Sequence, residues 1–210
     1  MELDGLAGGL YRISQKITQF FYINCLWFLF TLLGGIVLGF FPATTAMHAV
    51  MRKIIDNEDP PIFNTFKKTY FEEFKNSNLL GVILIGIIYM LYIDFQYVML
   101  MDYSILSLAL YAGLLTVGLL VGIISMYVFP LLAQHRLSVF QYIKYSCFIG
   151  ISNPLITLSM GVALIFCVSL IKDLPVILLF FGSFISYVWM FFTMKIVRQL
   201  NTAVVKPREI

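Results

Sequence analysis

The 25 residues from Ile105 to Phe129, ILSLALYAGLLTVGLLVGIISMYVF, contain no Asp, Glu, Lys or Arg. A helix of about 20 apolar residues is long enough to cross the hydrocarbon core of a bilayer, which is about 30 Å thick. A strand of a membrane barrel would alternate polar and apolar residues, whereas this stretch is apolar on every face. It therefore predicts a transmembrane helix and an all-α membrane fold.

The rest of the chain supports the same class of protein. Of its 210 residues, 60% are hydrophobic and 12% are charged, whereas soluble domains average roughly 45–50% apolar and about 25% charged residues. Four further stretches satisfy the length requirement, and Asp94 is the only formally charged residue within the five. We expect one integral membrane domain over 1–210, a multi-pass bundle with spans at 20–41, 79–101, 105–129, 154–171 and 174–194.

The basic residues predict an orientation in the membrane. Loops rich in Lys and Arg remain in the cytoplasm, and eleven of the fourteen Lys and Arg residues follow the first, third or fifth span. Five spans then place the N-terminus outside and the C-terminus in the cytoplasm. We expect the first apolar run to be retained rather than cleaved as a signal peptide, since it is too long and ends in Phe41-Pro42.

Two shorter segments have helical periodicity but are too polar to cross. Aromatic residues recur at helical spacing over 62–74, and a weaker pattern covers 137–151. We expect both to be cytoplasmic interfacial amphipathic helices, with the aromatic residues in the headgroup layer. Each follows a Phe-Pro pair, Phe41-Pro42 or Phe129-Pro130, which suggests a faint internal repeat. A duplicated structural hairpin and the two halves of a transport path are both compatible with it.

Signals for chemistry are scarce. The three cysteines, Cys25, Cys147 and Cys167, have neither CxxC nor metal-like spacing. No arrangement typical of nucleophilic or metal catalysis occurs, so we expect no catalytic residues, no cofactor, no metal site and no enzyme. A net charge of +3 is too small to indicate nucleic acid as a partner.

Several stretches resemble the YesL-like family of bacterial integral membrane proteins, a domain of unknown function. They are Asn24-Cys25-Leu26-Trp27, the stretch 41–46 (FPATTA) and the stretch 63–68 (FNTFKK) followed by Phe71 and Phe74. In many relatives a Gly or Leu-Pro element interrupts the first span, where this chain has Gly34-Gly35. The resemblance implies a multi-pass cell-membrane protein, often encoded near carbohydrate-uptake or polysaccharide-utilisation systems, and brings no catalytic residues with it.

Two sets of residues are candidates for function. A cytoplasmic docking surface for a partner or for lipid is suggested by charge and sidedness, although passive anchoring is the simpler interpretation. Its residues are His48, Arg52, Lys67, Lys68, Gln134, His135 and Arg136. Polar groups within or beside the spans form the second set, Asn24, Asp94 and Asn153. Helix packing is expected for Asn24, and Asn153 with Pro154 is expected to end the helix before the fourth span. For Asp94 we expect a position at the rim of the bundle, with a proton-relay or ion-binding role as the alternative.

These patterns favour a non-enzymatic accessory membrane protein associated with carbohydrate or oligosaccharide uptake. Its expected partners are the lipid bilayer and sugar-importer permease subunits, or a second copy of itself. The alternative is a small permease in its own right, since aromatic faces and amides can hold sugars. A membrane enzyme acting on lipid or glycan is the third possibility.

Overall fold

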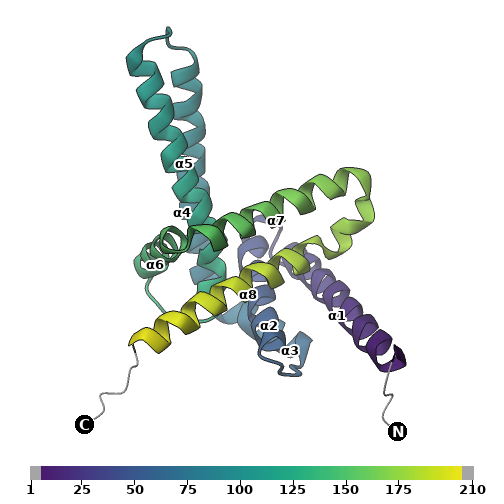
Figure 1. Ribbon diagram of the computed structural model, residues 1–210. Helices are drawn as coiled ribbons and strands as arrows, with labels where there is room; N and C mark the ends of the chain where they lie inside the picture. The colour runs from purple at the N-terminus through teal and green to yellow at the C-terminus, as the bar shows by residue number, and fades with distance from the viewer. Residues whose placement is uncertain (1–5, 205–210) are drawn as a thin grey trace, which may run out of the picture.

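The computed structural model describes residues 6–204, and the side chains of residues 14–200 other than Asp173 and Pro175. Within this range the chain is helical and contains no strand, as expected for an all-α membrane protein (Figure 1). The elements are α1 (Leu6–Leu33), α2 (Val37–Ile55), α3 (Ile62–Glu72), α4 (Phe74–Met99), α5 (Ile105–Leu132), α6 (Val139–Ser152), α7 (Pro154–Asp173), a 3-10 turn η1 (Pro175–Ile177) and α8 (Leu178–Val204).

Five of the described helices are long and apolar enough to cross a membrane. The qualifying stretches are Ser14–Leu33, Phe74–Met99, Ile105–Leu132, Pro154–Lys172 and Leu178–Leu200. Four of them overlap the predicted spans 79–101, 105–129, 154–171 and 174–194. The multi-pass character expected from composition is therefore confirmed.

The predicted first span, 20–41, is wrong as a single helix. Helix α1 ends at Leu33 and α2 begins at Val37, and the intervening turn has positive φ angles at Gly35 (69°) and Ile36 (68°). Gly34 and Gly39 let the two backbones meet, because a Cβ added to Gly34 would lie 2.3 Å from the Cα of Gly39. The apolar stretch therefore folds back on itself as a helical hairpin.

Helix α2 is the centre of the molecule. It packs against α1, α3, α4, α5 and α8, and most of its side chains from Gly39 to Met51 are buried. Two of its threonines find partners on neighbouring helices: the indole N–H of Trp27 donates to Thr44 Oγ1 (3.1 Å), and the hydroxyls of Thr45 and Ser77 lie 2.9 Å apart. Hydrogen bonds between helices offset the cost of desolvating these hydroxyls when a moderately polar helix is buried.

The helices expected over 62–74 and 137–151 are present as α3 and α6. Phe63 and Phe71 of α3 are exposed, whereas Phe66 and Tyr70 are buried. The expectation that the aromatic residues of this helix lie in the headgroup layer is therefore wrong for Phe66 and Tyr70. Their rings pack on Phe30 of α1 with centroid separations of 5.1 and 5.0 Å. Burial of an aromatic side chain of this size contributes on the order of 1.5–3 kcal/mol, so α3 is fixed to the core on one side.

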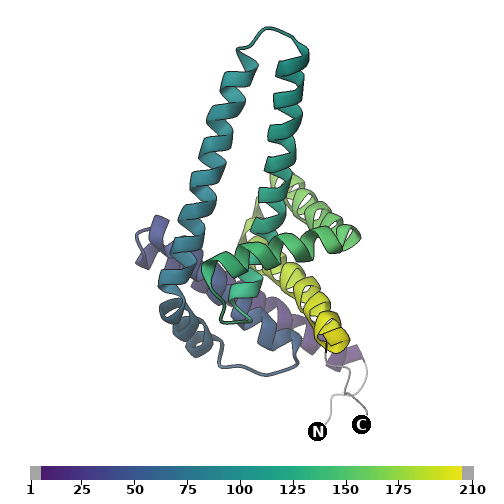
Figure 2. The same cartoon turned by 90° about the vertical axis from the view of Figure 1, so that its left-hand side faces the viewer.

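Two helical hairpins extend from this core in different directions. The α4–α5 hairpin and the α7–α8 hairpin both diverge from α2, and their tips are far apart (Figures 1 and 2). Their surfaces are strongly apolar: Leu100, Ile105 and Leu155 are among the most exposed side chains. The described start of α1, the α2–α3 connection, the α5–α6 connection and the end of α8 lie on the side of the core away from the α4–α5 tip, with the start of α1 and the end of α8 on opposite flanks of it (Figure 1). We call this side the basic end.

Candidate functional site

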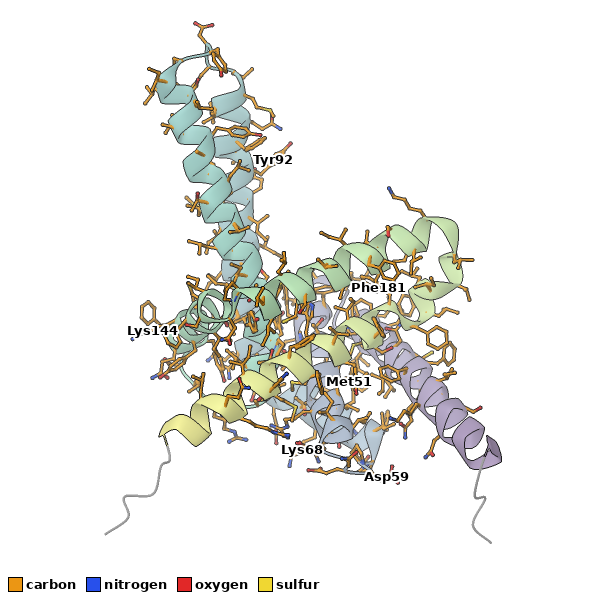
Figure 3. All side chains as sticks on the ribbon, in the orientation of Figure 1. Met51, Asp59, Lys68, Tyr92, Lys144 and Phe181 are labelled. Carbon is orange, nitrogen blue, oxygen red and sulfur yellow. The ribbon has the colours of Figure 1, made fainter. Side chains whose placement is uncertain are left out.

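A polar pocket of about 360 Å³ opens at the basic end. Its walls come from the last turns of α2, one face of α3 and the connection between α5 and α6. Lys68 lies at this end of the molecule, whereas Lys144 lies apart from it on α6 (Figure 3). We call it the basic-end pocket; its lining comprises Ala49, Arg52, Lys53, Thr65, Lys68, Thr69, Glu72, Glu73, Leu132, Ala133, Gln134, His135 and Arg136.

Arg52 joins two walls of the pocket. Its Nη1 donates to the carbonyl oxygens of Ala133 (2.9 Å) and Gln134 (3.4 Å), just beyond the C-terminus of α5. The carbonyls at a helix C-terminus carry partial negative charge, which a guanidinium stabilises. The side chain is half-buried and fixes the α5–α6 connection against α2.

Glu72 bridges two cations in the same pocket. Its Oε1 lies 3.9 Å from Lys68 Nζ, and its Oε2 lies 4.0 Å from Arg136 Nη2. These separations exceed hydrogen-bond distance, so the contacts are charge attraction without a shared proton. Lys68 and Arg136 are both well exposed, and solvent screening keeps such pairs weak.

A second polar cavity of about 350 Å³ adjoins the first and shares Glu72, Glu73 and Arg136 with it. Tyr142 forms its far wall, where its hydroxyl donates to the carbonyl of His135 (2.6 Å) and accepts from the backbone N–H of Leu137 (3.0 Å). Burial raises the pKa of Tyr142, so the hydroxyl stays protonated and able to donate.

His135 differs in character from the other basic groups of the pocket. Desolvation lowers its pKa from the usual 6.5, and the nearby charge of Arg52 lowers it further. The imidazole is therefore neutral at pH 7. The positive charge of the pocket comes from its lysines and arginines.

Of the seven residues predicted for a docking surface, five line the basic-end pocket: Arg52, Lys68, Gln134, His135 and Arg136. The prediction was wrong for His48, which is only 2% exposed and donates from Nδ1 to the carbonyl of Thr44 (2.8 Å) inside the core. Lys67 is exposed on α3 but does not line the pocket.

Two of the polar residues predicted within or beside the spans, Asn24 and Asn153, donate hydrogen bonds to backbone carbonyls. Asn24 donates from Nδ2 to the carbonyls of Leu178 (3.2 Å) and Leu179 (2.8 Å), which ties α1 to the start of α8. Asn153 separates α6 from α7 and donates to the carbonyl of Ile149 (3.0 Å). Asp94 is exposed near the C-terminal end of α4, and its position at the rim of the bundle stays a prediction.

Sequence reasoning missed the acidic and hydroxyl components of the pocket, Thr65, Thr69, Glu72 and Glu73, and also Lys53. A signal was available in the helical spacing, because Thr65, Lys68, Thr69 and Glu72 recur at steps of three and four and so share a face of α3. Within residues 6–204, no group of three or more His, Cys, Asp and Glu side chains is placed to hold a metal ion.

Comparisons with known proteins all point to one family of uncharacterized proteins. Residues 20–95 match the family model described as "Protein of unknown function, DUF624". The uncharacterized proteins YesV and YteU of Bacillus subtilis (strain 168) are 35% and 38% identical to the chain, over 90% and 89% of it and 92% and 84% of their own lengths. The uncharacterized protein YesL of the same organism is 29% identical over 95% of the chain and 94% of its own length. No solved structure matches the chain.

Proposed function

This chain belongs to the DUF624 family of YesL-like membrane proteins, and we propose that it is a non-enzymatic accessory component of a carbohydrate or oligosaccharide uptake system. The observation that carries the proposal is the basic-end pocket, a surface of mixed charge built from three separate elements. Interfaces between proteins commonly combine such charges with polar rims. Permease subunits of a sugar importer are the proposed partners, in the setting that the family resemblance implies.

The absence of an enzymatic role is part of the proposal. Among the described side chains that line the pocket, no hydroxyl is hydrogen-bonded to a histidine or a carboxylate. That pairing is what activates a hydroxyl nucleophile. The lining is instead organised by ion pairs and by contacts to backbone carbonyls, which suits recognition.

We place the protein in a bacterial cell membrane with the basic end and the C-terminus in the cytoplasm, in accordance with the positive-inside rule. The sequence prediction of an external N-terminus counted 20–41 as one crossing. The α1–α2 hairpin supports another arrangement, in which α1 and α2 both cross and the N-terminus is also cytoplasmic. Every Lys and Arg of the chain except Lys172 then lies on the cytoplasmic side.

Affinity purification tests the accessory role. The tagged full-length protein is isolated from its native membrane, and co-purifying proteins are quantified by mass spectrometry. Sugar-importer permease subunits are expected with the wild-type chain and should be depleted with the double variant Lys68→Glu and Arg136→Glu. The matched control is Lys144→Glu, which reverses an exposed charge outside the pocket.

Two outcomes would contradict the proposal. Equal recovery of the permease subunits with both variants would show that the pocket does not contact them. Recovery of the protein alone, together with sugar flux into proteoliposomes, would favour a permease in its own right. The cavity between α4 and α5 gives that alternative little support, because its lining, Ile88, Leu91, Tyr92, Phe95, Leu114, Leu115, Gly118 and Leu119, is almost entirely apolar.

A further inference from the structure

We propose that the basic-end pocket binds a phosphate ester whose alcohol part carries hydroxyl groups, the chemistry shared by a glycerophospholipid headgroup and a soluble polyol phosphate. The inference concerns the same pocket as the proposed function but goes beyond it, because it requires no protein partner. Its basis is the size, the charge and the unused hydrogen-bond donors of the pocket.

The volume fits a small polar ligand. At about 360 Å³ the pocket lies within the range of roughly 300–1,000 Å³ that is typical of small-molecule sites. A lone phosphate would leave much of this space unfilled. Thr65 and Thr69, one helical turn apart on α3, place two hydroxyls in the lining where an alcohol group of the ligand can bind.

The charge of the lining favours an anion. Four cations, Arg52, Lys53, Lys68 and Arg136, share the pocket with two carboxylates, Glu72 and Glu73. The cations come from α2, from α3 and from the α5–α6 connection, so a bound anion would contact three elements at once. Pockets of this composition at the cytoplasmic ends of transmembrane helices suit phosphate-bearing headgroups.

The position of Glu72 indicates where a phosphate would bind. Its carboxylate lies between Lys68 and Arg136 at 3.9 and 4.0 Å, so an anion is already accommodated there. Because these distances are too long for hydrogen bonds, the N–H groups of both cations remain able to donate. A phosphate offers more acceptor oxygens than a carboxylate and pairs well with a planar guanidinium.

Arg52 supplies the fixed part of the site. One of its nitrogens, Nη1, is held by the carbonyls of Ala133 and Gln134. Its other N–H groups have no hydrogen-bond partner among the described residues. A half-buried cation that is already oriented loses little conformational entropy when a ligand binds.

Binding is measured on the purified full-length protein in nanodiscs of phosphatidylcholine. Isothermal titration calorimetry with glycerol 3-phosphate, against glycerol as control, tests the soluble source. Nanodiscs that contain phosphatidylglycerol, compared by thermal unfolding with phosphatidylcholine alone, test the lipid source. Saturable binding of the first probe or stabilisation by the second supports the proposal and identifies the source. Absence of both effects would overturn it.

Single substitutions separate a built site from diffuse attraction to a basic surface. Lys68→Gln and Arg136→Gln should each weaken binding about 10-fold, as expected for loss of a charge-assisted hydrogen bond. Glu72→Gln should strengthen it several-fold, since the competing carboxylate is removed. Lys144→Gln should leave it unchanged. All four side chains are exposed, and unfolding temperatures confirm that each variant is folded.

Equal weakening by Lys68→Gln and Lys144→Gln, or weaker binding by Glu72→Gln, would overturn the assignment of the pocket. A result of this kind can be told apart from failure of the accessory role. The binding assay contains only this protein and its probe, whereas the accessory role is tested by co-purification from the native membrane.

Discussion

At the residue scale, glycine permits the contact between α1 and α2. A Cβ on Gly39 would lie 2.3 Å from the carbonyl oxygen of Thr31, a backbone atom that cannot move independently of its helix. We expect Gly39→Ala to lower the free energy of unfolding by about 1–3 kcal/mol through overpacking. Thermal unfolding in detergent micelles measures the change. Gly118→Ala is the matched control, because a Cβ there has no neighbour within 4 Å, and equal destabilisation by the two variants would contradict the close packing.

In the turn between the same helices, substitutions at the adjacent residues Gly35 and Ile36 should change the free energy of unfolding in opposite directions. Gly35 and Ile36 both have φ near +69°, a region that costs an L-residue with a side chain about 1–2 kcal/mol. Gly35→Ala should therefore lower the free energy of unfolding. Ile36 is 59% exposed, so Ile36→Gly should relieve strain with little loss of packing and raise it by up to about 1 kcal/mol. Denaturant titration in micelles measures both, and the reverse order would contradict this turn.

His135 makes the charge of the basic-end pocket depend on pH, because its imidazole becomes protonated at acidic pH. Its pKa is lowered in the folded protein by desolvation and by Arg52. Protonation of this side chain therefore destabilises the folded state as the pH falls below the unfolded pKa of about 6.5. Arg52→Gln should raise the pKa of His135, which NMR of histidine ring nitrogens measures between pH 5 and 8. Lys144→Gln serves as the control and should leave it unchanged. An unaltered pKa in Arg52→Gln would show that the guanidinium charge does not act on the ring.

At the scale of elements, the sequence predicts most helices but not how the first apolar run folds. Length and hydropathy are sufficient for α4, α5 and α7, since each contains an apolar stretch long enough to cross a membrane. The run 20–41 is equally apolar on both sides of Gly34-Gly35. The mean hydropathy of the run therefore cannot show that the chain reverses direction at these glycines. Only the left-handed backbone at Gly35 and the close approach at Gly39 create the hairpin.

The candidate site was predictable only in part, because charge and sidedness indicate which basic residues share one end of the molecule but not which side chains are buried or in contact. Charge and sidedness gather Arg52, Lys68 and Arg136 at one end of the molecule, and the structure brings them into one pocket. They could not reveal that His48, only four residues from Arg52, is enclosed by the core. They also gave no account of Glu72, whose role depends on a contact with Arg136, 64 positions away in the chain.

At the scale of the whole molecule, the faint sequence repeat has a structural counterpart. Helices α2, α3 and α4 follow the same order as α5, α6 and α7: a helix with an internal proline, a short amphipathic helix and a long apolar helix. The repeated pairs Phe41-Pro42 and Phe129-Pro130 also meet in space, since the two phenylalanine rings stack with centroids 5.8 Å apart. Helix α2 is not among the five helices that are long and apolar enough to cross a membrane, whereas α5 is. The expectation that α2 also crosses therefore rests on its correspondence with α5 and on the α1–α2 hairpin.

A crossing α2 makes a clear prediction about topology. Single cysteines are placed at Ser14 in α1, at Lys68 in α3 and at Asp102 in the α4–α5 tip, in a chain whose Cys25, Cys147 and Cys167 are replaced by alanine. All three sites are exposed. An impermeant maleimide added to intact cells should label the cysteine at 102 alone, because two crossings by α1 and α2 return the chain to its starting side. Those at 14 and 68 should be labelled only after the membrane is opened. External labelling at 14 with protection at 68 would mean that the first apolar run makes one net crossing, and α2 would then not be the counterpart of α5.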